Sequence, residues 1–411
     1  MTKRWIYVIW GVIGMLFAGL IYAWSVMSRP IAAHFDSWSS AQLSLTFTIC
    51  MAFFCLGGLV SGLLSGKLSV KLKLMISAVL FLAGFAITAR MNSLALLYIG
   101  YGVMAGLASG FVYNTIVSTI TKYFPDKLGL ISGILLMGFG MGSFIIGKVY
   151  HALTGEGEAF RNSFMAFGVI LFVVIFLISF LIKAPTQSEI EEYQAQAKAK
   201  AKTKTKGSNA QGATVEAKEL TTTQMVKKNS FWLYFIWTTL LSASGLALIA
   251  QASPIVLEVN SVVTSGTLST VVGLISIFGG VGRVLFGGMY DGKGRLKTMW
   301  SISVVLVISI IMMTAAMAMG SFVLLIGGYI VMGLAYGGLP PTNSAYVGDF
   351  YGKKHYPVNF SVMNLCLLVA SFAGTISGAL FDASGSYFST LIFMGAAAII
   401  GIICSVFIKK P

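Results

Sequence analysis

A single arginine, Arg283, lies within a long apolar stretch whose other residues carry no charge. A cation inside such a stretch is costly in hydrocarbon and is usually found facing a cavity, a partner group or a transported ion. Its guanidinium is a planar fork that binds a carboxylate through two parallel hydrogen bonds. The position therefore predicts a carboxylate-binding site. The alternatives are snorkelling to the end of the stretch and a structural ion pair.

Phenol and amide side chains in other apolar stretches can support such a carboxylate. They bond its second oxygen, or a hydroxyl or keto group beside it. For each of them the alternative is a hydrogen bond between helices. We predict as substrate-binding residues, besides Arg283, the side chains of Tyr22, Tyr113, Asn114, Gln251, Tyr336, Asn343 and Asn364.

The sequence gives no indication of catalysis, a disulfide framework or a metal site. Four cysteines all fall inside apolar runs, which predicts neither a disulfide framework nor a metal site. The three histidines lie near predicted loops, and no catalytic motif is present. We therefore expect no catalytic residues, no metal, no cofactor and no enzymatic activity. A channel would be expected to show a filter or a ring built from repeated subunits, which one chain does not suggest.

The amino-acid composition indicates that these residues lie in a membrane. Hydrophobic residues make up 57% of the 411 residues and charged residues 10%, whereas a soluble domain carries about 25% charge. Apolar stretches of about 20 residues, enough to span a bilayer, recur along the chain. We predict spans at 5–28, 41–65, 74–91, 94–121, 128–152, 163–183, 230–257, 265–289, 298–318, 321–348, 356–381 and 386–408.

The twelve spans predict an all-α membrane protein with two pseudo-symmetric six-helix halves, residues 1–183 and 230–411. Such halves bind substrate near the midplane between them. Residues 184–229 are polar, include a lysine run at 197–206, and predict a flexible basic linker. The alternative for the lysine run is a solvated tail with no specific ligand.

Charge predicts the orientation of the chain. If both termini and the linker share one side, that side holds 23 of the 28 Lys and Arg residues, and the positive-inside rule makes it cytoplasmic. The net charge of +15 is then a topology signal and does not indicate nucleic acid. We expect a multi-pass protein of a bacterial-type cytoplasmic (inner) membrane, a monomer with both termini cytoplasmic.

The loop after the eighth span contains Gly287, Asp291, Gly294, Arg295 and Lys297, in the pattern G-x-x-x-D-x-x-G-R-x-K. It resembles the loop motif of the major facilitator superfamily, to which that family attributes a conformational role. The corresponding loop of the first half departs from the pattern, since Gly66 replaces the aspartate and Ser69 the glycine. For the first-half loop, plain positive-inside anchoring is the alternative.

Four further motifs lie in matching helices: Tyr22-x-Trp24 with Pro30, the link from Tyr123 to Gly129, Gly138-x-Gly140-x-Gly142, and Pro341-Thr-Asn343-Ser344. Together they resemble the oxalate:formate antiporter family, a neighbour of the monocarboxylate porters, through both halves. The resemblance implies that Arg283 binds substrate, and Tyr22 and Tyr113 match tyrosines of the family pattern. Dicarboxylate carriers of the family place a second cation in helix 11, at a position that corresponds to Met363 here.

One buried positive charge balances one carboxylate, and a second anionic charge left uncompensated in low dielectric costs several kcal/mol. We therefore expect a small monocarboxylate (lactate, pyruvate or formate) as substrate, carried by alternating access. Monocarboxylate porters pair the helix 8 arginine with a protonatable carboxylate. Glu258 is the nearest candidate for proton symport, with a solvated helix-end glutamate as the alternative. The alternative function is anion exchange of the oxalate:formate type.

Glycines recur on equivalent helices of both halves, in helices 2, 5, 8 and 11. Small residues let helix backbones approach closely in a membrane, where no hydrophobic force drives helices together. Static packing is one interpretation. The other is an interface along which the two halves rock during transport. We expect none of these glycines to contact substrate directly.

Overall fold

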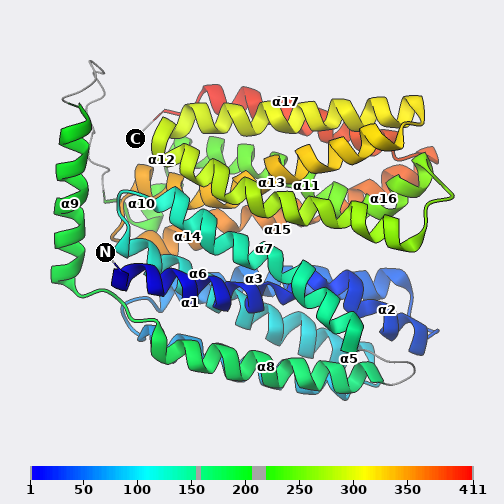
Figure 1. Ribbon diagram of the computed structural model, residues 1–411, viewed down its shortest axis with the longest axis horizontal. Helices are drawn as coiled ribbons and strands as arrows, with labels where there is room; N and C mark the ends of the chain where they lie inside the picture. Colours follow the sequence, from blue (N-terminus) through cyan, green and yellow to red (C-terminus); the bar gives the residue numbers. More distant parts are fainter. Residues whose placement is uncertain (1, 154–158, 206–218, 410–411) are drawn as a thin grey trace.

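Long apolar helices make up most of residues 2–153, 159–205 and 219–409, which the computed structural model describes. Within these residues there is no strand, only an isolated bridge between Ser65 and Leu68. Figure 1 shows the long apolar helices running roughly along the long axis of the molecule, while α9 (Gln187–Thr205) lies across one end. We call the end that carries both termini and helix α9 the linker end, and the opposite end the far end.

The N-terminal half contains six crossings. The first and the fourth are built from several helical segments each, because their geometry changes within the crossing. Their bounds are α1 Thr2–Ala18, η1 Gly19–Ala23 and α2 Trp24–His34; α3 Ser40–Leu63; α4 Val70–Ala89; α5 Leu94–Leu97, η2 Tyr98–Ala105, α6 Gly106–Ile120 and η3 Thr121–Tyr123; α7 Leu128–Leu153; and α8 Ala159–Leu181.

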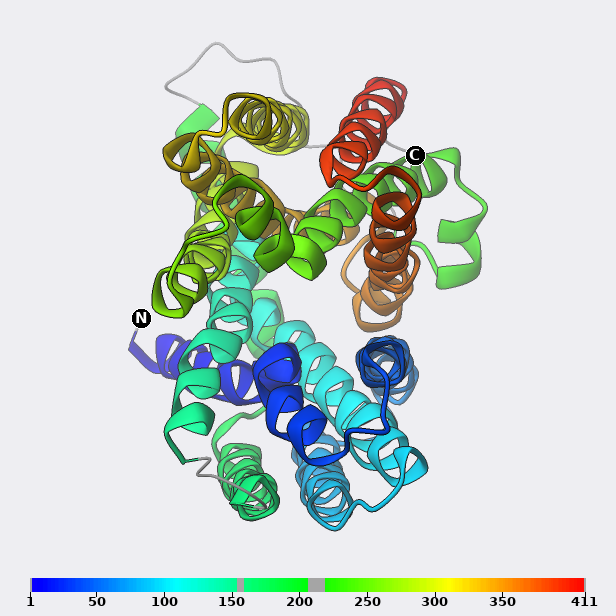
Figure 2. The same cartoon turned by 90° about the vertical axis from the view of Figure 1, so that its right-hand side faces the viewer.

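The C-terminal half repeats this arrangement, and one of its crossings, the eleventh, is divided into three segments. Its helices are α11 Asn229–Val259, α12 Ser265–Met319, α13 Phe322–Tyr351, the series α14 Tyr356–Asn364, α15 Cys366–Ser371 and α16 Ala373–Ser384, and α17 Phe388–Val406. Figure 2, viewed from the far end, shows the two halves as two groups of helices facing each other.

Twelve crossings follow from the lengths of these helices. Among the described residues, ten helices are long and apolar enough to cross a membrane, and a shorter apolar helix covers Leu128–Gly142 within α7. One of the ten, Gly266–Met319, has 54 residues, about twice what one crossing needs. It is broken at Gly294, which has a φ of 80° and a ψ of 174°, so α12 makes two crossings. The predicted all-α fold of twelve crossings is confirmed.

The loop between the eighth and ninth crossings is shorter than the sequence predicts. We expected a break from 290 to 297, whereas the chain keeps helical geometry up to and beyond Gly294. The positive φ of that glycine, which only a residue without a side chain adopts readily, makes the turn in one step.

The outer faces of the bundle are apolar. Large hydrophobic side chains such as Leu177, Ile311 and Ile392 are more than half exposed. A soluble protein would expose few contiguous apolar surfaces of this kind. Hydrocarbon chains of a bilayer satisfy such faces, and the protein is therefore a multi-pass membrane protein.

Part of the linker is helical in the residues that the structure describes. Helix α9 (Gln187–Thr205) and the short helix α10 (Thr222–Val226) lie at the linker end. Alanine, lysine, glutamine and glutamate dominate α9, and all four are strong helix formers. Residues 206–218 lie outside the described residues.

Candidate functional site

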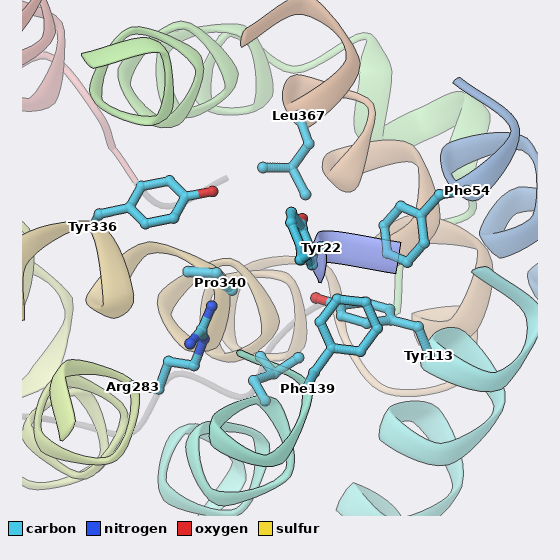
Figure 3. A pocket seen from close by; sticks show the side chains of 9 residues that line it. Tyr22, Phe54, Tyr113, Phe139, Arg283, Tyr336, Pro340 and Leu367 are labelled. Carbon is cyan, nitrogen blue, oxygen red and sulfur yellow. The ribbon is translucent and has the colours of Figure 1, made fainter. Parts of the chain in front are cut away.

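A cavity lies between the two halves, midway along the bundle. The space between its lining atoms is about 320 Å³, including the part open to solvent. Figure 3 shows side chains from both halves converging on it. The lining residues are Tyr22, Phe54, Tyr113, Leu136, Phe139, Arg283, Tyr336, Pro340 and Leu367.

Irregular backbone positions two of the tyrosines. Tyr22 belongs to η1, a 3-10 turn between α1 and α2, and mid-helix turns of this kind often mark functional positions. Tyr336 lies one helical turn before Pro340, whose missing N–H leaves the carbonyl of Tyr336 without its helical donor. Tyr113 sits on α6, which follows the π-helical stretch η2.

The polar groups of the cavity are left without protein partners. Within the described residues, no hydrogen bond or ion pair engages the Arg283 guanidinium or the hydroxyls of Tyr22, Tyr113 and Tyr336. Buried polar groups in folded proteins are nearly always paired. Three phenol groups and a guanidinium around one space are therefore suited to a ligand that carries acceptor oxygens.

The charge of the cavity is that of one arginine. Of the nine lining residues, only Arg283 is charged, and none is acidic. The eleventh crossing contributes the apolar Leu367, which lies on α15. Met363, the position that corresponds to the family's second cation, is fully buried and does not line the cavity. The cavity can thus neutralise one negative charge.

Asn114, a predicted substrate ligand, instead joins the two halves. Its Nδ2 donates to the carbonyl oxygen of Pro357 at 3.0 Å and to Oγ of Ser361 at 2.6 Å. The Ser361 hydroxyl donates to the carbonyl oxygen of Gly58 at 2.8 Å. We call these four residues the interhalf clamp. It lies on the linker-end side of the cavity, since α14 begins at that end and Leu367 lies farther along the same crossing.

Asn364 lies beside the clamp and is also away from the cavity lining. Its carbonyl oxygen accepts a hydrogen bond from Cys55 Sγ of α3 at 3.7 Å. Its Oδ1 is buried and has no partner in the described part of the chain.

Two other predicted ligands are engaged within the C-terminal half. Asn343 accepts hydrogen bonds from Tyr234 and Thr238, each at 2.9 Å. Gln251 donates to the carbonyl oxygen of Gly374 at 3.3 Å and accepts from Tyr387 Oη at 3.1 Å. Neither side chain lines the cavity. Of the eight predicted substrate residues, the structure brings together Arg283, Tyr22, Tyr113 and Tyr336.

Glu258, the predicted proton site, is exposed near the far end of α11. Its carboxylate accepts hydrogen bonds from Ser386 Oγ at 2.5 Å and from the backbone N–H of Tyr387 at 3.0 Å. These donors immediately precede α17, so the carboxylate ties the end of α11 to the start of that helix. The side chain does not line the cavity.

The two loops of the superfamily-like motif behave differently. In the second half, the Asp291 carboxylate accepts hydrogen bonds from the backbone N–H groups of Gly129 at 2.9 Å and Leu130 at 2.7 Å. Both belong to the first turn of α7, so the contact crosses between the halves. Beyond the turn at Gly294, the Arg295 guanidinium lies over the Phe350 ring at 5.4 Å.

In the first half, where Gly66 replaces the aspartate, the side chain of Lys73 makes its hydrogen bonds within that half. Its Nζ donates to the carbonyl oxygen of Ser61 at 3.3 Å and to Oγ of Ser65 at 3.1 Å. A cation at the C-terminal end of α3 is favoured by the helix dipole. This loop is therefore anchored to its own half.

Lys353 makes another contact between the halves at the linker end. Its Nζ donates to the carbonyl oxygen of Pro125 at 3.1 Å. Burial lowers the pKa of the Lys353 ammonium, while the carboxylates of Glu219 and Asp126 act in the opposite direction. Together with the clamp and Asp291, this bond joins the two halves on the linker-end side of the cavity.

Sequence reasoning missed the apolar wall of the cavity. Phe54, Leu136, Phe139, Pro340 and Leu367 carry no distinctive signal, because such residues are equally common on every buried face of a membrane bundle. Pro340 alone had a usable signal, since it follows Tyr336 by one turn and therefore shares its helix face.

Two six-helix halves with a cavity between them are the architecture of a membrane transporter. A family model described as Major Facilitator Superfamily matches residues 7–316 and 263–411. The chain belongs to this superfamily.

Curated relatives narrow the class within the superfamily. The oxalate:formate antiporter of Oxalobacter formigenes is 27% identical over 364 residues, which cover 86% of this chain and 80% of that protein. Monocarboxylate transporter 12 of Mus musculus is 30% identical over 121 residues, covering 29% of this chain and 24% of that protein. The resemblance to this branch of the superfamily is confirmed.

Solved structures agree on the fold. The proton:xylose symporter XylE bound to 6-bromo-6-deoxy-D-glucose superposes with a TM-score of 0.74 at 12% identity, covering 100% of this chain and 96% of that one. A double tryptophan variant of XylE gives a TM-score of 0.77 at 14% identity, with 100% and 97% covered. At these identities the likeness concerns the fold alone.

Proposed function

We propose that this transporter carries a small monocarboxylate, of the lactate, pyruvate or formate class, across the cytoplasmic membrane by alternating access. The observation that carries the proposal is the Arg283 guanidinium, which faces a cavity with three tyrosine hydroxyls and has no partner of its own among the described residues. A carboxylate would take two parallel hydrogen bonds from the guanidinium and further bonds from the phenols.

The single charge favours a monoanion over oxalate. A carboxylate bound to Arg283 leaves the cavity neutral, whereas a second carboxylate would face Leu367 and the other apolar walls. A buried charge without a partner costs several kcal/mol. The oxalate:formate antiporter is thus a relative of this chain whose doubly charged substrate this cavity would not balance.

Ligand stabilisation tests the substrate class. A ligand that binds only the folded state raises apparent stability in proportion to its affinity. Purified protein in detergent should therefore gain more thermal stability from lactate or pyruvate than from oxalate at equal concentration. Tighter binding of oxalate than of lactate would contradict the monocarboxylate assignment and would imply a second cation near the substrate.

For the orientation, we propose that the linker end is cytoplasmic, as the distribution of Lys and Arg predicts. In this conformation the clamp, Asp291 and Lys353 join the two halves on that side. The conformation would then be closed toward the cytoplasm.

For the energy coupling, we propose proton symport with Glu258 as the proton site, as predicted from the sequence. Anion exchange is the second candidate, and the absence of an acidic residue from the cavity lining favours it. An exchanger needs no proton site, because it returns only with another anion bound to the arginine.

Proteoliposomes separate the two modes. An imposed pH gradient alone should drive lactate uptake by a symporter, and it should fail with an exchanger that lacks internal anion. Glu258→Gln mimics the protonated acid, so it should abolish gradient-driven accumulation while labelled lactate still exchanges for unlabelled lactate. If this variant accumulates lactate as the wild type does, Glu258 is not the coupling site. Asp382→Asn, an exposed acid at the same end of the half, is the matched control.

A further inference from the structure

Gly140 of α7 lies directly against the guanidinium of Arg283. A Cβ atom built on Gly140 would overlap Nη1 and Cζ of the arginine and would lie 2.8 Å from its Nη2. Three atoms of the guanidinium therefore share the space that any side chain at position 140 would need. The guanidinium of Arg283, in the C-terminal half, therefore packs directly against the backbone of α7 in the N-terminal half.

Gly133 brings the backbone of the arginine to the same helix face. A Cβ atom at Gly133 would overlap the carbonyl oxygen of Arg283 and lie 3.0 Å from its carbonyl carbon. Positions 133 and 140 are seven residues apart, which places them on one face of α7. The two glycines thus form a cradle, with Gly133 receiving the backbone of Arg283 and Gly140 receiving its guanidinium.

Two other arginines are held by hydrogen bonds to backbone carbonyls. Arg161 Nη1 donates to the carbonyl oxygen of Met91 at 2.6 Å, and Arg4 Nη1 donates to that of Tyr123 at 3.3 Å. Arg283 has no such bond among the described residues. Packing against α7 therefore determines where its guanidinium lies.

We propose that Gly140 is a positioning residue that sets the affinity for substrate by fixing the place of the Arg283 guanidinium. This inference rests on the proposed function, in which the guanidinium binds a carboxylate. A methyl group at position 140 would displace the guanidinium, and a bidentate pair tolerates little displacement because both hydrogen bonds must stay aligned. Since α7 and Arg283 belong to different halves, the cradle also links carboxylate affinity to the closeness of the halves.

The test compares Gly140→Ala with Gly288→Ala. Both add one methyl group at the contact between α7 and α12, but a Cβ at Gly288 would lie 3.4 Å from Leu130 Cδ1, an ordinary contact distance. Gly140→Ala should raise the KM for lactate by about tenfold or more, since small misplacements of a binding group have effects of this order. The maximal rate and the melting temperature without ligand should change much less. Gly288→Ala should match the wild type in all three.

Two further measurements distinguish a displaced Arg283 guanidinium from a general loss of structure in Gly140→Ala. Lactamide lacks the carboxylate charge, so Gly140→Ala should reduce the preference for lactate over lactamide in competition assays. Phenylglyoxal labels arginines, and mass spectrometry of the Arg283 peptide reports the reactivity of its guanidinium without any substrate. Gly140→Ala should change the rate of this labelling, and Gly288→Ala should not.

A wild-type KM together with wild-type labelling in Gly140→Ala would overturn the proposal. Equal effects of the two alanine variants would overturn it as well, because they would indicate helix packing in general. If the wild-type protein neither transports lactate nor is stabilised by it, the proposed function fails. The labelling of Arg283 then still decides whether Gly140 positions the guanidinium.

Discussion

The central cavity and the interhalf clamp use similar polar chemistry, and neighbouring residues of α6 supply them. Tyr113 faces the cavity with a hydroxyl that has no partner among the described residues. Asn114, the next residue, is 1% exposed and donates two hydrogen bonds to α14. A polar group left open can bind a ligand, whereas a polar group already bonded across the halves holds a conformation.

The two regions are also in direct contact. The Tyr113 ring stacks on Phe360 of α14, with centroids 5.9 Å apart and ring planes 10° apart, and Phe360 precedes Ser361 of the clamp. A ligand that moves Tyr113 would therefore press on the helix that carries the clamp. The comparison predicts that changes in the cavity alter binding, and that changes in the clamp alter the balance between conformations.

The largest effect is expected for Arg283→Lys. Lysine keeps the charge but loses the planar fork and with it one of the two parallel hydrogen bonds to the carboxylate. A hydrogen bond to a charged group contributes about 1.5 to 3 kcal/mol, so uptake of lactate in proteoliposomes should fall by about ten- to a hundredfold. The melting temperature without ligand should stay close to that of the wild type. A lysine variant that transports at the wild-type rate would show that the guanidinium does not bind substrate directly.

A smaller effect, of a different kind, is expected for Asn114→Ala. The variant loses both hydrogen bonds to α14, and a hydrogen bond of this kind contributes about 0.5 to 1.5 kcal/mol. Spin labels on Lys67→Cys and Lys293→Cys, two exposed positions in the loops of the two halves, should show longer distances at the linker end.

Asn343→Ala is the control for the clamp. It removes an amide bonded only within the C-terminal half, so it should lower stability without changing the label distance. If Asn114→Ala leaves the distance distribution unchanged, the clamp does not hold the linker end closed.

The smallest effect is expected for Asp291→Asn. The amide can still accept a hydrogen bond from Gly129 or Leu130, but it loses the charge that favours an acid at a helix N-terminus, which is worth about 0.3 to 1 kcal/mol. The same label pair should show a slight shift toward longer distances. Lys73→Met, in the loop that is anchored to its own half, should leave the distances unchanged. Equal shifts in the two variants would remove the distinction between the loops.

Much of the fold could be predicted from the sequence, because apolar length and loop charge report directly on membrane crossings. The role of Arg283 could be predicted equally well, since a cation in an apolar span has few explanations. The roles of the amide side chains could not be predicted. Asn114, Gln251 and Asn343 can bond a ligand or a neighbouring helix with the same groups, and only the three-dimensional structure shows which groups lie within reach.

Segment breaks and close approaches were also hidden from the sequence. The turns at Leu365 and Phe372 divide the eleventh crossing without a proline or glycine at either position. Gly140 resembled the other glycines of its helix in sequence. Its neighbours Gly138 and Gly142 pack against the carbonyl oxygens of Val12 and Leu16 in α1, and Gly140 alone of the three faces the arginine.

The chain is held in place on both sides of the linker helix α9, at Lys183 where the N-terminal half ends and at Glu219 within the linker, each time by the adjacent half. Tyr123 Oη donates to the carbonyl oxygen of Lys183 at 3.0 Å. Glu219 accepts from the backbone N–H groups of Lys353 and Lys354 at 3.2 and 2.8 Å. Two separate polypeptides, divided between residues 206 and 218, would each retain an anchor. Co-expressed in one bilayer, they should assemble into a working transporter, because the cavity needs the proximity of the halves and not their covalent continuity.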